Sequence, residues 1–255
     1  MSAQKKRNKK QSNGSGGFIF GSVSFVVICA ALVLAMCVFF KVSKIEVTGN
    51  SRYSDEEVIA ASGIKEGSNL VFLNREKAQE HLYNELIYIS GANVSRKLPN
   101  KVVIELWESS AVAAVETDGG FWLIDNNCRL LSECTMSQAE AYITIIGVCG
   151  LSPKAGDELT ATPEDAPRIK YLKAILTSIK QRDILPNVDN LDVSNIANAQ
   201  FSYTERFTVK LGKNEYIDNK FEMLLGAVSK LEPEERGIID VSEDKKAHFS
   251  PNEEN

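Results

Sequence analysis

The chain has 255 residues, of which 44% are apolar and 25% are charged, and its formal net charge is −5. Five of the 29 basic side chains lie in the first seventeen residues, which carry no acidic side chain, so the rest of the chain is net acidic by about ten charges. A surface that binds nucleic acid needs the opposite sign, which excludes that class of function. The roughly 215 residues after position 40 suffice for one large or two small cores.

The first predicted element is an uncharged apolar run from Phe18 to Phe40. As a helix it would be about 34 Å long, enough to cross the roughly 30 Å hydrocarbon core of a bilayer. Lysines and arginines near a span stay on the cytoplasmic side. The sequence therefore predicts a cytoplasmic tip (residues 1–17), a transmembrane helix (18–40) and an extracytoplasmic remainder. The residues that determine this topology are Lys5, Lys6, Arg7, Lys9 and Lys10.

Two alternatives to an uncleaved anchor remain open. A cleaved signal peptide usually has an apolar region of about 7–15 residues that ends at small residues, whereas this run is longer and ends Val38-Phe39-Phe40-Lys41. The segment Leu34-Ala35-Met36-Cys37 resembles a lipoprotein cleavage box, except that Met36 stands where a small residue is needed. Both observations favour the anchor.

Three cysteines lie beyond the apolar run: Cys128, Cys134 and Cys149. An odd number cannot form a complete disulfide framework. A bridge between Cys128 and Cys134 remains possible, but the pattern favours three small, partly buried hydrophobic side chains.

The next segment, residues 41–108, predicts a small βααββ domain. An alternating strand over 42–47 ends at the turn signal Gly49-Asn50. Ser54 and Glu57 form a capping box for a helix over 55–62, and Asn74 caps a second helix over 75–86. Two strands follow, over 88–95 and 101–108. Two helices on one face of a three-stranded sheet make a self-contained unit.

These residues resemble a known family. The strand ending in Gly-Asn, the helix that begins Ser-Asp-Glu-Glu, and the sequence ANVSRKLPNKVVIELWE are similar to the polypeptide-transport-associated (POTRA) domain of the FtsQ (DivIB) family of bacterial cell division proteins. The family usually continues with Arg and Pro, where this chain has Ser109, Ser110 and Ala111. We therefore expect a less rigid joint between the POTRA domain and the next domain of the chain.

The resemblance continues through residues 109–242, which it implies to be a larger β-rich domain with two helices, so the expected fold class is α+β. A hairpin over 121–132 has Cys128 where the family often has Gly. A strand is expected within the segment 142–159, which carries Gly147 and Gly156, and further strands are expected near 190–193, 199–203 and 207–211. One helix runs from 163 to 182, and a second carries the apolar stripe Phe221, Leu224, Leu225 and Val228. The polar residues 243–255 are predicted to be a disordered tail.

The predicted binding site is the final strand. An unpaired strand near the C-terminus offers backbone N–H and C=O groups to a strand from another chain. The resemblance implies that this strand recruits single-pass division proteins of the FtsB/DivIC and FtsL type; an ordinary internal strand is the alternative. The predicted partner-binding residues are Ile238, Ile239, Asp240, Val241, Ser242, Lys220 and Arg96.

Catalysis finds little support in the sequence. His81 falls near the apolar face of a helix and His248 in a polar stretch, and neither has a neighbour at metal-ligand spacing. We expect no enzyme activity, no cofactor and no small-molecule substrate. The predicted function is an extracytoplasmic scaffold of the divisome, enriched at the septum of the bacterial cell membrane. The alternatives are a POTRA-bearing component of secretion or envelope assembly and an anchored enzyme.

Overall fold

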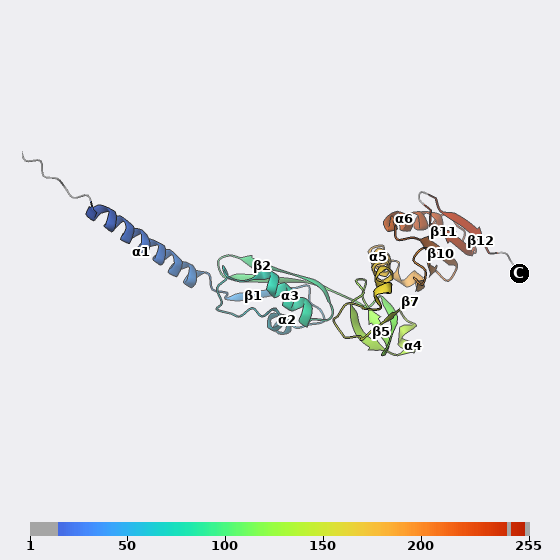
Figure 1. Cartoon of the computed structure of the whole chain (residues 1–255), viewed down its shortest axis with the longest axis horizontal. Coiled ribbons are helices and arrows are strands. Elements are labelled where there is room, and N and C mark those ends of the chain that lie inside the picture. Colours follow the sequence, from blue (N-terminus) through green and yellow to red (C-terminus); the bar gives the residue numbers. More distant parts are fainter. Residues whose placement is uncertain (1–14, 244–245, 253–255) are drawn as a thin grey trace, which may run out of the picture.

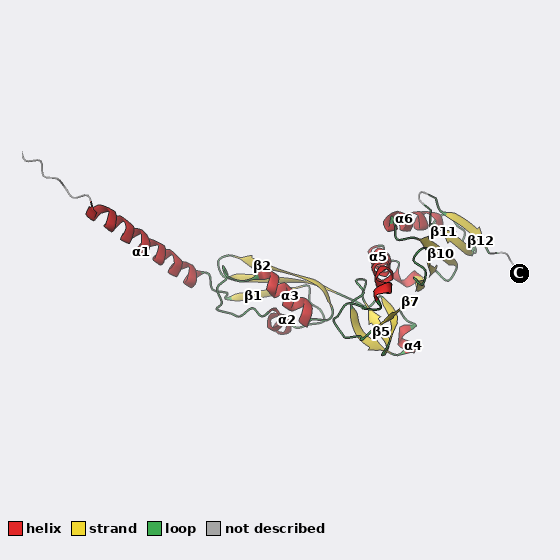
Figure 2. Ribbon diagram, viewed as in Figure 1, coloured by secondary structure: helices red, strands yellow, loops and turns green. Residues whose placement is uncertain are grey.

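The structure is a computed structural model that describes residues 15–243 and 246–252. A long helix, a small domain with a three-stranded sheet and a larger domain with a nine-stranded sheet follow one another end to end (Figures 1 and 2). This α+β architecture confirms the predicted fold class. The tip residues 1–14, with all five topology-determining charges, lie outside the described residues.

Helix α1 spans Ser15–Phe39. Its segment Gly21–Phe39 is long and apolar enough to cross a membrane, and none of that segment is buried against the rest of the chain. An apolar helix that buries none of this segment against its own chain is compatible with the predicted membrane anchor.

The small domain has the predicted βααββ order. Its elements are β1 (Lys44–Thr48), α2 (Asp55–Ser62), α3 (Arg75–Glu85), β2 (Ile89–Lys97) and β3 (Lys101–Glu108). The strand order is β1-β3-β2, with β1 parallel and β2 antiparallel to β3. The capping box of Ser54 and Glu57 is present, and Asn74 caps α3. Both helices begin at the residue that their cap predicts.

The large domain is built on one mixed sheet of nine strands in the order β12-β11-β10-β9-β8-β7-β4-β5-β6. The first half contributes β4 (Ala113–Thr117), β5 (Gly120–Ile124), β6 (Leu130–Cys134), α4 (Met136–Ala139) and β7 (Ile143–Gly150). The second half contributes α5 (Ala166–Gln181), β8 (Val188–Asp192), β9 (Ala199–Tyr203), β10 (Phe207–Gly212), α6 (Ile217–Val228), β11 (Gly237–Asp240) and β12 (His248–Pro251).

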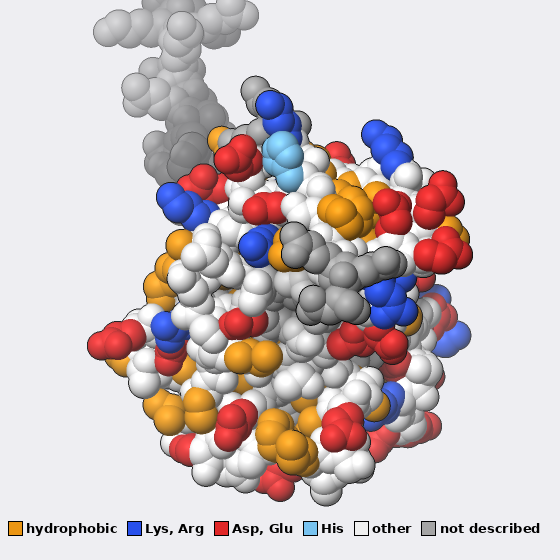
Figure 3. Space-filling view, turned by 90° about the vertical axis from the view of Figure 1, so that its right-hand side faces the viewer, with side chains coloured by type: hydrophobic (Ala, Val, Ile, Leu, Met, Phe, Trp, Pro, Cys, Tyr) orange, Lys and Arg blue, Asp and Glu red, His pale blue; other side chains and the backbone are white. Residues whose placement is uncertain are grey.

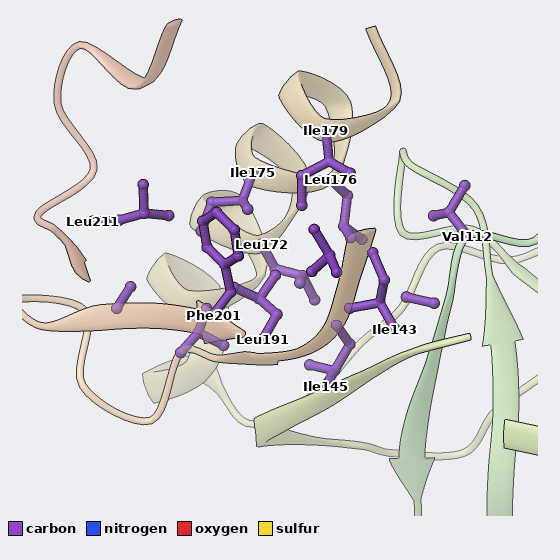
Figure 4. Packing of buried hydrophobic residues seen from close by; sticks show 14 of the residues in the cluster. Val112, Ile143, Ile145, Leu172, Ile175, Leu176, Ile179, Leu191, Phe201 and Leu211 are labelled. Carbon is purple, nitrogen blue, oxygen red and sulfur yellow. The ribbon is translucent and has the colours of Figure 1, made fainter. Parts of the chain in front are cut away.

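Helix α5 covers one face of this sheet. Its apolar stripe packs on residues from the central strands, among them Ile145, Leu191 and Phe201 (Figure 4). Phe201 also stacks on Phe221 of α6, with 5.7 Å between the ring centroids. The four residues of this stripe are fully buried: Leu172, Ile175, Leu176 and Ile179. The sheet and the two helices therefore share one core.

Arg129 fixes the joint between the two domains. Its guanidinium donates hydrogen bonds to the carbonyls of Tyr83 (2.5 Å), Leu86 (3.4 Å) and Ile89 (3.0 Å), where α3 ends and β2 begins, and it lies 4.0 Å from the centroid of the Tyr83 ring. The last carbonyls of a helix have no partner inside the helix. Arg129, which is 1% exposed, provides one from the other domain. This bridge argues against the looser joint expected from residues 109–111.

The tail prediction is wrong for residues 248–251. They form β12, which pairs antiparallel with β11. Phe249 is half-buried and packs edge-to-face on Phe207, at 6.1 Å between ring centroids. The physical reason is that β11 offers an open row of backbone groups, and one aromatic side chain suffices to dock a polar strand on it. The predicted tail residues 244–245 and 253–255 lie outside the described residues.

The cysteines of the described chain are all free, so the 128–134 bridge that the sequence left open is not formed. Cys128 is buried, Cys134 is half-buried and Cys149 is exposed. Burial raises the pKa of the Cys128 thiol to about 12. Cys128 therefore packs as a small hydrophobic side chain, as predicted.

Candidate partner-binding edge of the C-terminal sheet

Strand β11, predicted to be the open edge, is an internal strand. It pairs parallel with β10 and antiparallel with β12. Its backbone groups are therefore used on both sides, and β12 is the edge strand of this end of the sheet. The prediction that residues 238–242 themselves pair with a partner strand does not fit this position.

The side chains of β11 alternate between buried and half-buried. Ile239 and the following Val241 are fully buried, whereas Ile238 and Asp240 are half-buried. The register places Ile238 opposite Ser250 and Asp240 opposite His248. These pairs lie on the face of the sheet away from the core, because opposite residues in a ladder share a face.

The hydrogen-bond alternation of an antiparallel pair shows which groups of β12 point outward. The N–H of Asn252 donates to the carbonyl of Arg236 at 2.9 Å, so the residues two and four positions back, Ser250 and His248, also face β11. The intervening Phe249 and Pro251 turn their backbone groups away from the sheet. Pro251 has no N–H. The outward donor of the strand is therefore the N–H of Phe249.

β12 lies close to β11 because of a glycine. A Cβ at Gly237 would lie 2.1 Å from the carbonyl oxygen of Ser250 and 2.9 Å from the Cα of Pro251. No side chain fits there, so Gly237 is required for the two strands to pair at this register. On the core side, Phe249 fills the space beside Phe207.

The turn after β11 is held by Asp240. Its carboxylate accepts a hydrogen bond from the N–H of Ser242 at 2.9 Å. Partial burial alone would raise the pKa of Asp240, but the hydrogen bonds from Ser242 and the positive charges of Lys210 and His248 hold this pKa below its ordinary value. Asp240 and Ser242 therefore have a structural role at the end of β11, beside the edge strand.

Lys220, a predicted contact residue, is buried at 2% exposure. Its ammonium donates to the carbonyls of Leu211 (2.8 Å) and Lys213 (2.7 Å), and the Tyr171 hydroxyl donates to the carbonyl of Gly212 at 2.9 Å. Both side chains fix the end of β10 and the start of the following loop, which line a shallow depression together with Ser242. A direct contact between Lys220 and a partner does not fit this arrangement.

Arg96 lies in the other domain, at the end of β2. Its guanidinium donates to the carbonyl of Leu73, and its side chain is exposed. The structure therefore brings five of the seven predicted residues together in β11 and the turn after it, places Lys220 behind the neighbouring loop and separates Arg96 from them.

The opposite edge of the nine-stranded sheet is partly covered. β6 begins at Leu130, whose N–H donates to Asp157 and whose carbonyl accepts from Gly156, and Leu159 donates to the carbonyl of Cys128. Within the part of the chain that the structure describes, no strand pairs with the outer side of β12. Of the two edges, β12 offers the freer backbone.

The surface at this end of the molecule is mixed. Figure 3 shows apolar side chains in separate small groups among acidic and basic ones. Docking through one large apolar patch would need a continuous area of that kind. Recognition through backbone groups, with side chains choosing the partner, suits this surface better.

The small domain matches a known domain family. Residues 40–108 match the family described as "POTRA domain, FtsQ-type". Over most of its length the chain is also similar to bacterial cell division proteins. It is 25% identical to the cell division protein DivIB of Clostridium tetani, over 86% of this chain and 83% of that protein. It is 26% identical to DivIB of Clostridium acetobutylicum, over 84% and 85%.

The chain also matches a protein named FtsQ, over a shorter segment. The chain is 32% identical to the cell division protein FtsQ of Corynebacterium glutamicum over 104 residues. The POTRA match and the long DivIB alignments together confirm the resemblance seen in the sequence: the chain is similar to cell division proteins named DivIB and FtsQ, and its small domain matches the FtsQ-type POTRA domain.

Sequence reasoning missed β12, the strand at the centre of this site. Its residues His248, Phe249, Ser250 and Pro251 contain one large apolar side chain and no sustained alternation. The only signal was Phe249 itself, an aromatic residue within an otherwise polar segment. A lone aromatic residue of that kind indicates a docking point for the backbone around it.

Proposed function

We propose that the chain is a membrane-anchored scaffold of the bacterial divisome that recruits other single-pass division proteins on the outer side of the cytoplasmic membrane. The relatives named as cell division proteins support the division role, and helix α1 supports the anchor. The basic tip favours a cytoplasmic N-terminus. The fold is then a means of holding the C-terminal sheet outside the membrane.

The observation that carries the proposal is the outward-facing backbone of β12. The N–H and carbonyl of Phe249 point away from β11, and the carbonyl of Pro251 does so too, on a strand whose outer side is unpaired within the described residues. Such an edge is normally covered or blunted, because it pairs with any suitable strand. Here Pro251 blunts one end and leaves the segment around Phe249 open. An added strand from a partner would continue the sheet.

The partners that fit are those implied by the family resemblance, namely proteins of the FtsB/DivIC and FtsL type. A single-pass partner in the same membrane can present an extended extracytoplasmic segment at the height of β12. In this arrangement β11 supports the edge rather than contacting the partner's backbone. Ile238 lies opposite Ser250 on the same face of the sheet and supports β12 from the side away from an added strand.

Localisation of a fluorescent fusion tests the division role. We expect a fusion of the full chain to form a band at midcell in dividing cells, and capture of the chain to enrich single-pass division proteins. A fusion spread evenly over the envelope, in cells whose division proteins assemble normally, would contradict the proposal. It would favour a role in secretion or envelope assembly instead.

A further inference from the structure

The POTRA domain is attached to α1 without a linker. The helix ends at Phe39, and Val42 is already buried in the POTRA core. The carbonyl of Phe40 accepts a hydrogen bond from the N–H of Leu70 at 2.6 Å, and Val42 exchanges hydrogen bonds with Ser68 and Gly67. The loop that joins α2 to α3 is therefore fixed against the end of the helix.

One contact reaches further along the helix. The side-chain amide of Asn69 donates to the carbonyl of Met36 at 3.3 Å. Met36 lies three residues before the end of α1, which is about 5 Å along the axis at 1.5 Å per residue. If α1 spans a bilayer, the Asn69 loop lies at the depth of the interface.

The hairpin between β2 and β3 belongs to the same end of the domain. The N–H of Ser43 donates to the carbonyl of Asn100 at 2.8 Å, and Arg96 donates to the carbonyl of Leu73. The turn of this hairpin and the loop after α2 therefore lie together around the point where the chain leaves α1. We call this region the helix-proximal end; it comprises residues 41–46, 65–77 and 96–101.

Two large apolar side chains of the helix-proximal end point into solvent. Phe72 is 77% exposed and Leu98 is 69% exposed. A soluble domain gains nothing by exposing them, but both are suited to the boundary between headgroups and acyl chains. Neither lies on a strand edge or in the joint with the large domain, so the C-terminal site does not explain them.

The helix-proximal end carries a net positive charge, whereas residues 41–255 as a whole carry a net negative one. It carries eight basic and three acidic side chains, whereas residues 41–255 together carry 24 basic and 34 acidic ones. The eight are Lys41, Lys44, Lys65, Arg75, Lys77, Arg96, Lys97 and Lys101. Lysines and arginines beside a bilayer are attracted by anionic phospholipids. Positive charge is thus concentrated where the structure attaches the domain to α1.

We propose that the helix-proximal end of the POTRA domain lies on the bilayer that α1 spans, with Phe72 and Leu98 inserted between the headgroups and the basic side chains on anionic phospholipids. The inference rests on the proposed anchoring by α1. Its consequence is a fixed orientation: the POTRA domain is held against the membrane surface at the loop and the hairpin as well as at the helix.

Lipid contact can be measured on the full chain in lipid nanodiscs. Phe72→Trp places a fluorophore in the loop, and Met136→Trp is the matched control, since Met136 is 68% exposed but lies in α4 of the large domain. The emission of the parent protein, which contains only the native tryptophans, is subtracted from that of each variant. In discs of phosphatidylcholine and phosphatidylglycerol with brominated acyl chains, we expect quenching of the residue-72 signal at least threefold stronger than that of the control.

The charge requirement is tested in the same assay. Lys65→Glu with Lys97→Glu, added to Phe72→Trp, should halve the quenching, while Lys154→Glu with Lys230→Glu, two changes in the large domain, should leave it unchanged. Neutral discs should give weaker quenching than anionic ones. Equal quenching in neutral and anionic discs would overturn the role of anionic lipid.

The nanodisc experiment distinguishes a failure of the proposed anchoring by α1 from a failure of the proposed contact with the membrane surface. A chain that does not enter the discs, judged by co-elution with lipid, would contradict the anchor itself. A chain that enters the discs but whose residue-72 signal is quenched no more than the control would overturn only the surface contact. If that signal is also protected from acrylamide, another protein segment rather than lipid covers Phe72.

Discussion

Glu46 shows how single residues join the strands of the POTRA sheet. Its carboxylate on β1 forms ion pairs with Lys101 of the neighbouring β3 and with Lys44 of its own strand, the latter at 3.0 Å. The hydrogen bond from Lys101 and then that from Lys44 lower the pKa of Glu46 from 4.5 to about 2. The contact therefore stabilises the domain only while the carboxyl group is ionised.

The sign of the pH dependence is set by this shift. A carboxyl group whose pKa is lower in the folded state contributes its full stability above the unfolded value, and loses it as the pH falls through the folded value. As the pH falls from about 4.5 to 2, we expect the stability of the POTRA domain to decrease less in Glu46→Gln than in the parent. Chemical denaturation across that pH range measures the difference. Glu80→Gln, an exposed change on α3, is the control. Equal pH profiles for the parent and Glu46→Gln would contradict the expectation.

Cys128 illustrates what the sequence shows about a single position and what it does not. The resemblance indicates a glycine near this turn, and Cys128 adopts φ +61°, the left-handed conformation that glycine favours. The conformation was therefore foreseeable. The buried place of its side chain depends on Leu159 and the rest of the core, which no local pattern shows.

Among the helices and strands, those with a clear signal in a few consecutive residues were predicted at the correct positions. Helices α2 and α3 begin where expected because their caps are encoded within four residues. Strands β4 and β12 were not predicted, because neither shows a period-two alternation: β4, between β5 and β7, is buried on both faces, and β12 has a single large apolar side chain. At the C-terminal end a strand was predicted at the position of β11, but the edge strand is β12, which was not predicted.

Helix α6 provides a test of packing at this scale. Leu224 is fully buried, whereas its neighbour Leu225 is only partly buried. We expect Leu224→Ala to lower the free energy of unfolding by roughly 2–5 kcal/mol. Leu225→Ala, the matched control on the same helix, should cost less than half as much. Urea unfolding followed by circular dichroism measures both, and equal costs would contradict the packing described for α6.

For the whole molecule, the position of β12 depends on two fixed joints. The first joins α1 to the POTRA domain through Phe40, Val42 and Asn69. The second is Arg129, which ties the POTRA domain to the large domain. Together they hold the C-terminal edge at a set distance from the end of α1, at the far end of an elongated chain (Figure 1). The proposed role as a scaffold for single-pass partners depends on such a fixed distance.

The second joint can be broken selectively. Arg129→Ala leaves the carbonyls of Tyr83, Leu86 and Ile89 without their donor, and each unsatisfied buried group costs about 1–3 kcal/mol. We expect separate unfolding transitions for the two domains in calorimetry and a broader distribution of shapes in small-angle scattering. Arg168→Ala removes a partly exposed arginine paired with Asp165 and is the control, expected to cost below about 1 kcal/mol. A single transition and an unchanged shape in Arg129→Ala would contradict the role of this bridge.

The most direct measurement is the affinity of a partner's extracytoplasmic segment for two proline variants of β12. The register points the N–H of Phe249 outward and that of Ser250 toward β11. Phe249→Pro also removes the aromatic ring that packs on Phe207, so Phe249→Ala is its control. We expect Phe249→Pro to bind at least tenfold more weakly than Phe249→Ala, about 1.4 kcal/mol.

Ser250→Pro completes the comparison, because it should release β12 from β11 and lower the stability of the large domain. Phe249→Pro, by contrast, should leave the stability of the large domain close to that of Phe249→Ala. All variants are compared as folded full chains by circular dichroism and isothermal titration. Equal affinities of folded Phe249→Pro and Phe249→Ala for the partner segment would contradict strand addition at β12 and move the interface elsewhere, most simply to the POTRA sheet.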